Sequence, residues 1–256
     1  MKPSEGTKRL YTDPNQCVES RVEDLLGRMT LEEKIGQMCQ YTRYPEKHEE
    51  LVEAGKVGSL FNVTGAEKTN EVQRIAVEQS RLGIPLIFGL DVIHGYSTIY
   101  PIPLAMASSW DPEMAKKAAS IAAAEASSEG IHWTFAPMVD IARDPRWGRV
   151  AEGAGEDPYL GSVMAKAVVE GYQGEDLTDP HTIVACPKHY VAYGGAEGGR
   201  DYNTVEVSER TLRDIYLPPF MAAVEAGAGT LMSAFDSGGC SSLAGSPASI
   251  FLAALT

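Results

Sequence analysis

The chain alternates between short apolar segments and longer helical segments, and this alternation constrains its fold more than any other feature. Helical patterns, either amphipathic or rich in alanine, cover residues 18–41, 67–81, 112–129, 158–171 and 208–226. Apolar runs typical of buried strands cover residues 57–61, 86–90, 133–139, 183–190 and 229–235. Strands that alternate with helices predict βαβ units and a parallel sheet.

Four helix starts carry capping residues. Thr30 and Glu33 have the spacing of a capping box, in which each side chain bonds the other residue's backbone N–H. Asp111 and Asp157 each precede a proline, which suits the first position of a helix. Ser208 is the fourth cap, so these positions fix where four helices begin.

Polar residues follow the strands and favour a barrel. They are Asp91 and His94, residues 140–149, Lys188 and His189, and Ser233 and Asp236. In parallel α/β folds, active groups lie at the C-terminal ends of the strands, and convergence at one rim is typical of a barrel. The competing fold is a doubly wound sheet, which favours a Gly-rich phosphate loop that the sequence lacks. The glycines of residues 194–199 are interpreted as a flexible loop.

The composition of the chain argues against several classes of binding partner and cofactor. The formal net charge is −13, so nucleic acid and anionic membrane surfaces are not expected partners. No apolar run approaches the length of a membrane span, and the N-terminus has no signal-peptide pattern, which favours the cytoplasm unless a true N-terminus was removed. The cysteines form no C-x-x-C pair, so neither a metal nor a redox cofactor is expected: Cys17, Cys39, Cys186 and Cys240.

Two motifs offer groups for binding hydroxyls. Asp91 directly follows a buried strand, where its carboxylate could accept hydrogen bonds from adjacent sugar hydroxyls or simply cap a loop. Three arginines surround Trp147; we expect Arg143 and Arg146 to pair with nearby carboxylates and Arg149 to face a ligand.

A third motif, Lys188-His189, ends a strand. These side chains could donate to sugar hydroxyls or act as acid and base. Two other enzyme classes stay open at this point. An aldolase would use Lys188 for a Schiff base, and a metal-dependent enzyme would need Asp91, His94 and His189 to converge.

Taken together, these motifs resemble glycoside hydrolase family 3, close to its bacterial periplasmic β-glucosidase type. The resemblance covers roughly residues 18–235 and rests on the segments at 89–95, 136–149, 155–160, 188–194, 197–203 and 231–235. It implies an N-terminal (β/α)₈ barrel followed by an α/β sandwich. It also implies that the sugar in the −1 subsite is held by Asp91, Arg149, Lys188 and His189, with further pocket positions at Arg200 and Phe235.

The sequence departs from the family pattern at its end. The family nucleophile is an aspartate that would lie beyond Thr256, and the acid/base usually comes from the second domain. Residues 236–256 carry no charge after Asp236, which suggests a frameshift or a truncation. We therefore expect residues 1–235 to form an incomplete barrel of five to six βα units, with no catalytic residue in this chain.

The expected function is that of a β-glucosidase-type hydrolase, which removes terminal β-D-glucosyl residues with retention, acting on a small oligosaccharide or other β-glucoside. The 256-residue chain alone is expected to be inactive. A non-catalytic carbohydrate-binding fragment and a β-xylosidase are the alternatives. An incomplete barrel also leaves open sheet edges, so self-association is expected.

Overall fold

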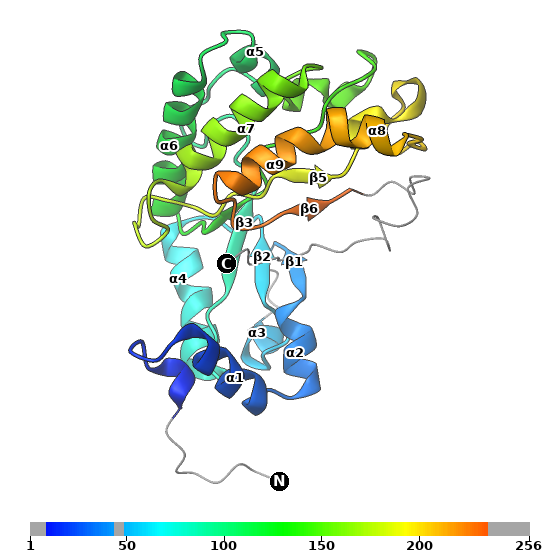
Figure 1. The fold of residues 1–256 in the computed structure, drawn as a ribbon. Helices are drawn as coiled ribbons and strands as arrows, with labels where there is room; N and C mark the ends of the chain where they lie inside the picture. Colours follow the sequence, from blue (N-terminus) through cyan, green and yellow to red (C-terminus); the bar gives the residue numbers. More distant parts are fainter. Residues whose placement is uncertain (1–8, 44–48, 235–256) are drawn as a thin grey trace. The chain divides into compact units, whose positions relative to one another are not determined.

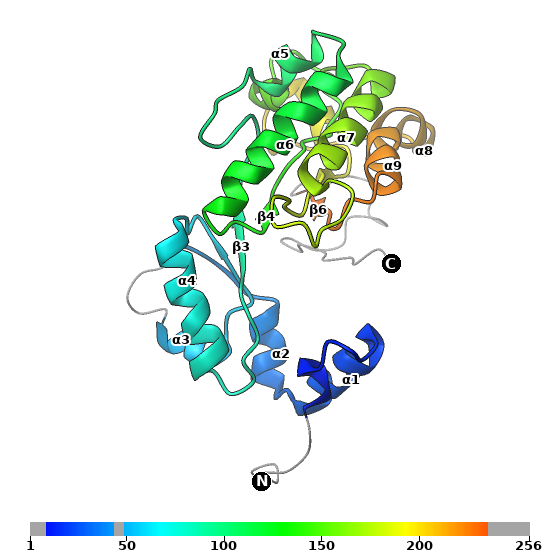
Figure 2. The same cartoon turned by 90° about the vertical axis from the view of Figure 1, so that its left-hand side faces the viewer.

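A computed structural model describes residues 9–43 and 49–234 (Figures 1 and 2). The chain divides into two compact units. Unit 1 comprises residues 1–63 and 67–87, and unit 2 comprises residues 64–66 and 88–256. Phe235 and the tail 236–256 therefore lie outside the described residues.

Unit 1 contains two parallel strands and several short helices. Strand β1 (Gln40–Thr42) pairs in register with β2 (Ser59–Phe61). The helices are η1 (Leu10–Thr12), α1 (Val18–Arg28), α2 (Leu31–Gln37), α3 (Glu49–Glu53), α4 (Ala66–Arg74) and the π-helix η3 (Ile75–Gln79). Leu60 on β2 and Val72 on α4 are fully buried in its core.

The helical region expected over residues 18–41 is broken in the structure. Thr30 adopts an extended backbone and caps α2, because its hydroxyl accepts from the N–H of Glu33 while the Glu33 carboxylate accepts from the N–H of Thr30. The predicted capping box is thus confirmed, but it begins a new helix. Arg81 adds two hydrogen bonds to the Glu33 carboxylate, at 2.9 and 2.5 Å.

Glu33→Gln is expected to destabilise the chain by about 1 kcal/mol at pH 7, since it weakens two charge-assisted bonds to a partly exposed arginine. The hydrogen bonds from Arg81 hold the pKa of Glu33 below its usual 4.5. The stabilisation is therefore complete above about pH 4.5 and is lost as the pH falls through the lower folded-state pKa. Urea unfolding followed by circular dichroism at pH 7 and pH 3 measures this difference.

Glu23→Gln is the matched control, since Glu23 is exposed on α1. It should leave the unfolding free energy within about 0.5 kcal/mol of the parent at both pH values. A Glu33→Gln deficit that persisted unchanged at pH 3 would contradict the assignment to the carboxylate charge.

Unit 2 is an α/β fold whose strands pair in parallel and in chain order. Strand β3 (Ile87–Leu90) pairs with β4 (Trp133–Thr134), and Trp133 bridges Val184. Met138 bridges Lys188 at the start of β5 (Lys188–Tyr190), which pairs with β6 (Met232–Ser233). The predicted parallel α/β arrangement is confirmed here.

Unit 2 also contains a series of helices (Figures 1 and 2). They are α5 (Pro103–Ala107), α6 (Pro112–Ser128), α7 (Pro158–Gln173), α8 (Glu209–Thr211), the π-helix η7 (Leu212–Tyr216) and α9 (Leu217–Glu225). Helix α7 contacts α6 on one side and α9 on the other. The predicted caps at Asp111, Asp157 and Ser208 all accept from a backbone N–H in the first turn.

Several strands are shorter than expected. The run 133–139 pairs as a regular strand only at Trp133–Thr134, and Pro137 has no N–H to donate to a neighbour. The glycine-rich segment expected as a flexible loop contains two 3₁₀ turns, η5 (Tyr193–Gly195) and η6 (Glu197–Gly199). A third 3₁₀ helix, η4 (Gly148–Glu152), follows the arginine motif.

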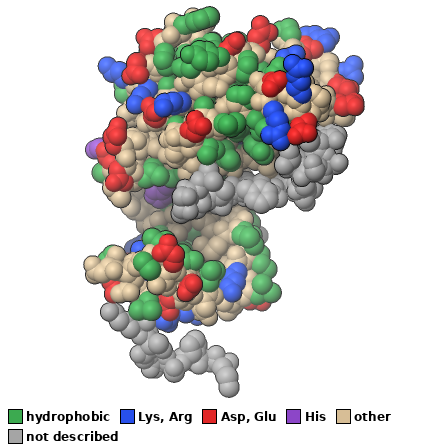
Figure 3. Space-filling view, viewed as in Figure 1, with side chains coloured by type: hydrophobic (Ala, Val, Ile, Leu, Met, Phe, Trp, Pro, Cys, Tyr) green, Lys and Arg blue, Asp and Glu red, His purple; other side chains and the backbone are tan. Residues whose placement is uncertain are grey.

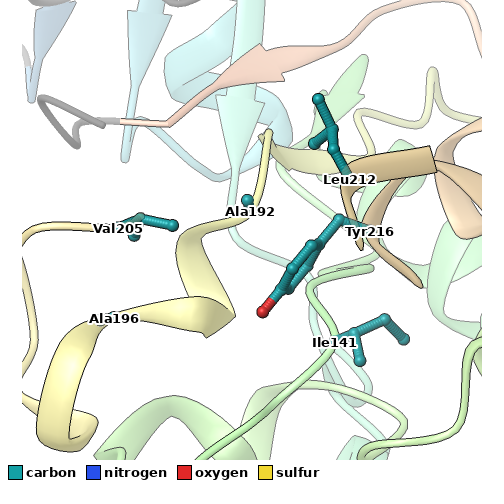
Figure 4. Packing of buried hydrophobic residues seen from close by; sticks show 6 residues of the cluster. All are labelled: Ile141, Ala192, Ala196, Val205, Leu212 and Tyr216. Atoms are coloured by element: carbon teal, nitrogen blue, oxygen red, sulfur yellow. The ribbon is translucent and has the colours of Figure 1, made fainter. Parts of the chain in front are cut away.

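One core cluster of unit 2 lies beneath this glycine-rich segment (Figure 4). The Tyr216 ring and Leu212, both from η7, lie among apolar side chains from the 141 segment and the 192–205 segment: Ile141, Ala192, Ala196 and Val205. This packing fixes the backbone that carries η5.

Acidic and basic side chains are interspersed over the visible face of unit 2 (Figure 3). No helix in the described parts of the chain is both long enough and apolar enough to cross a membrane. Cys17, Cys39 and Cys186 are free thiols, and burial raises the pKa of Cys186 to about 11.

Candidate functional site

The candidate site lies entirely in unit 2, on or next to its parallel strands. Asp91 comes directly after β3, Lys188 and His189 belong to β5, and Arg149 lies in η4. Because these strands pair in parallel and in chain order, their C-terminal ends lie on the same side.

Asp91 and Lys188 form an ion pair, with 2.7 Å between Oδ1 and Nζ. The Lys188 side chain is 5% exposed and that of Asp91 is 38% exposed. The lysine is therefore a buried cation whose charge is compensated by a carboxylate that also reaches solvent. Among the described residues Asp91 Oδ2 has no hydrogen-bond donor, so it can accept from a ligand.

Arg149 forms a two-point ion pair with Glu152, at 2.7 and 2.8 Å. Its guanidinium also lies over the Tyr193 ring, 5.4 Å from the centroid. Burial alone would lower the pKa of Arg149, but the hydrogen bonds and charge of Glu152 outweigh it and raise that pKa above its usual value. The arginine stays charged and is held in one orientation.

His189 is held from two sides. Its backbone N–H and its ring Nδ1 both lie within hydrogen-bond distance of Asp140 Oδ2, at 3.0 and 2.8 Å. Its ring makes an edge contact with Tyr193, with centroids 5.1 Å apart. Tyr193 thus contacts both His189 and Arg149.

Glu152 connects these groups electrostatically. Burial would raise its pKa, but the hydrogen bond and charge of Arg149, together with the charges of Lys188 and His189, lower it. Arg149 and His189 both contact the Tyr193 ring, and Lys188, the neighbour of His189 in the chain, pairs with Asp91. The structure therefore brings together the four side chains expected to bind a sugar: Asp91, Arg149, Lys188 and His189.

The other two expected pocket positions are not joined to this group. Arg200 is exposed and makes no side-chain hydrogen bond or ion pair with the described residues. Phe235 lies outside the described residues. Asp201, next to Arg200, accepts from Tyr193 Oη at 2.5 Å and from Trp147 Nε1 at 2.9 Å, which ties this loop to the site.

The arginine motif corrects one expectation, that for Arg143. Arg146 pairs with Asp144 as expected, and this pairing lowers the pKa of Asp144 to about 2. Arg143 was expected to do the same, but it is exposed and forms no ion pair with the described residues. Its backbone N–H instead donates to Gly194. Arg149, expected to face a ligand, also has a carboxylate partner in Glu152, three residues on along η4.

Sequence patterns did not single out Tyr193, although it is fully buried at the centre of the site. No group of three His, Cys, Asp or Glu side chains within residues 9–43 and 49–234 is arranged to hold a metal ion. His94 Nδ1 lies 3.1 Å from the carbonyl oxygen of Tyr100.

Comparison with known proteins shows which family this chain resembles. Residues 30–256 match the model of the glycosyl hydrolase family 3 N terminal domain. A periplasmic beta-glucosidase of Salmonella typhimurium is 41% identical over 220 residues, which cover 84% of this chain and 29% of that protein. A beta-xylosidase of Formosa agariphila is 42% identical over 191 residues, which cover 69% of this chain and 26% of that protein.

Solved structures of beta-glucosidases have a similar fold. The beta-glucosidase from Listeria innocua in complex with glucose superposes with a TM-score of 0.81 at 41% identity, covering 87% of this chain and 33% of that one. The same enzyme has also been solved in complex with isofagomine. The chain thus spans a third or less of the length of these relatives.

Proposed function

This chain belongs to glycosyl hydrolase family 3, and we propose that it forms the sugar-holding part of a β-glucosidase-type hydrolase. Its substrate would be a terminal, non-reducing β-D-glucosyl residue of a small oligosaccharide or other β-glucoside. The proposed binding residues are Asp91, Arg149, Lys188 and His189, with Arg200 and Phe235 as outer pocket positions.

We propose a barrel as the complete architecture. Strand β3 pairs with β4, isolated parallel bridges join residues 133 and 138 to residues 184 and 188, and β5 pairs with β6. Helices α6, α7 and α9 follow the same chain order. A doubly wound sheet would reverse its strand order at a switch point, whereas a barrel continues in one direction. Residues 1–235 would then supply five to six βα units, and residues 236–256 would form an atypical tail.

The observation that carries the proposal is the convergence of buried Lys188 and His189 and half-buried Arg149 with the carboxylate of Asp91, which reaches solvent. Asp91 would accept hydrogen bonds from two adjacent sugar hydroxyls through its exposed carboxylate oxygens. Lys188 and Arg149 would donate to further hydroxyls, and His189 would offer its Nε2. Fixed ion pairs hold these groups in place before the ligand arrives, so binding orders few side chains.

Retaining hydrolysis needs two carboxyl groups about 5–5.5 Å apart, one as nucleophile and one as acid/base. We assign neither role within residues 1–256. From the family pattern we propose that the nucleophile is an aspartate outside residues 1–256 and that the acid/base comes from a further domain. The residues named above therefore bind and orient the sugar, and full activity is proposed for the longer protein.

Calorimetry and a turnover assay on the 256-residue chain test this proposal. We expect saturable heats with glucose and with isofagomine, and no release of aglycone from an aryl β-glucoside above the buffer rate. Absence of binding by both ligands would contradict the sugar-holding role. Turnover that Asp91→Ala abolishes would instead show that this chain carries its own catalytic groups.

β-Xylosidase activity is the second candidate, since a beta-xylosidase is 42% identical to this chain. Xylose differs from glucose by the absence of one hydroxymethyl group. Competition calorimetry with xylose against glucose compares the two sugars, and a preference for xylose would favour this candidate.

A further inference from the structure

Asp140 is the most deeply buried carboxylate near the site. It follows the predicted strand 133–139, and its side chain is completely buried. Its Oδ2 accepts from the backbone N–H of His189 at 3.0 Å and lies 2.8 Å from the ring Nδ1. Its Oδ1 has no partner among the described residues.

Such a carboxylate needs strong compensation, because an unpaired buried charge is costly. Within the described residues, His189 is its only hydrogen-bonding partner. Asp201 differs in this respect, since it accepts from Tyr193 and Trp147 and does not bond His189. The Asp140–His189 pair is therefore a separate unit within the site.

This contact constrains the imidazole proton. A carboxylate only accepts, so the Nδ1 that faces Asp140 must carry hydrogen. In a neutral ring Nε2 is then the unprotonated nitrogen. The edge contact with Tyr193 limits rotation of the ring, so Nε2 is the one ring nitrogen left for a ligand.

We propose that Asp140 is a positioning residue that keeps a proton on His189 Nδ1 and leaves Nε2 to contact a sugar hydroxyl. Only the contact between Nε2 and a sugar hydroxyl rests on the proposed function. The fixed tautomer is a property of the free protein, and it is measurable without any sugar.

Nuclear magnetic resonance of the full 256-residue chain with ¹⁵N-labelled histidine tests the tautomer. The chain has five histidines, and His189→Gln identifies the resonance that disappears. At a pH where the ring is neutral, we expect the His189 Nδ1 shift to be that of a protonated nitrogen and the Nε2 shift to be that of a bare one. The reverse pattern in the parent chain overturns the proposal, without reliance on any variant at Asp140.

Three variants separate positioning from general structure. Asp140→Asn retains a carbonyl acceptor and should keep the proton on Nδ1, whereas Asp140→Leu has a similar shape without an acceptor and should allow the proton to move to Nε2. Asp201→Asn is the matched control and should leave the His189 shifts unchanged. An unchanged tautomer in a folded Asp140→Leu chain would contradict the proposal.

Glucose binding distinguishes this inference from the proposed function. We expect the glucose Kd to rise about tenfold in Asp140→Leu and to stay within about threefold of the parent in Asp140→Asn. If the parent shows the expected tautomer but binds no sugar, the proposed function fails and the positioning role stands. If Asp140→Leu binds glucose like the parent, the role of Nε2 in binding is refuted.

Discussion

Replacing Asp91 by alanine is expected to weaken glucose binding at least about 100-fold and to destabilise the chain by about 2 kcal/mol. The binding loss follows because hydrogen bonds to a charged acceptor are each worth about 1.5–3 kcal/mol, and Asp91 is proposed to accept two. The stability loss follows because Lys188 is buried and would lose its carboxylate partner at 2.7 Å. Breaking a fully buried pair costs about 3–5 kcal/mol, and the partial exposure of Asp91 reduces this.

The double variant Asp91→Ala with Lys188→Met separates the two effects. Removing both charges should recover most of the stability, because no buried cation remains unpaired. It should not recover binding, since both ligand contacts are gone. Urea unfolding measures the first effect and calorimetry with glucose the second.

Asp214→Ala is the matched control, since Asp214 in η7 forms an exposed pair with Arg210 in α8. Surface pairs of this kind contribute about 0.5 kcal/mol or less, so neither stability nor binding should change appreciably. A double variant at 91 and 188 as unstable as Asp91→Ala alone would contradict the buried-cation argument.

The parts of this fold that sequence predicts are those set by local rules. The caps at Thr30, Asp111, Asp157 and Ser208 each depend on residues within four positions of one another, and all four accept as expected. The approach of Asp91 to Lys188 is a long-range contact that the sequence predicts by placing both residues near the ends of parallel strands. In the structure Asp91 does follow β3, whereas Lys188 is the first residue of β5, so the expected strand end at Lys188 is wrong.

The parts that sequence does not predict depend on packing between distant segments. The motif predicts a carboxylate partner for Arg143 and a ligand-facing position for Arg149, yet Arg143 is exposed without an ion pair among the described residues, and Arg149 is half-buried beside Glu152 and Tyr193. The role of Tyr193 follows from a contact with Trp147, far away in the chain. The sequence also overestimates the lengths of strands, such as the run 133–139, because an apolar run indicates that a segment is buried but not that its backbone pairs with a neighbouring strand.

Gly194 illustrates the same gap between composition and packing. A run of glycines indicates a flexible loop, but a Cβ on Gly194 would lie 2.2 Å from the carbonyl oxygen of Ile141. The Gly194 carbonyl in turn accepts from the N–H of Arg143. Two backbone segments therefore touch here, and only a residue without a side chain permits the contact.

Gly194→Ala is accordingly expected to destabilise the chain by about 3 kcal/mol, the upper part of the range for overpacking, because rigid backbone cannot make room for the methyl group. It should also displace Tyr193, so that Arg149 and His189 lose the ring that both contact. Glucose binding should then fall at least about tenfold, although no proposed binding residue is changed. Urea unfolding and calorimetry measure the two effects.

Two other glycines separate this steric effect from glycine loss in general. Gly148→Ala meets nothing within 4 Å and should change stability by less than about 0.5 kcal/mol. Gly198 also has open space, but its φ of +66° should cost Gly198→Ala about 1 kcal/mol in backbone strain. If Gly194→Ala lowers the unfolding free energy no more than Gly198→Ala does, the backbone around residue 194 can move to admit the methyl group. The contact with Ile141 would then not be what holds Tyr193 against Arg149 and His189.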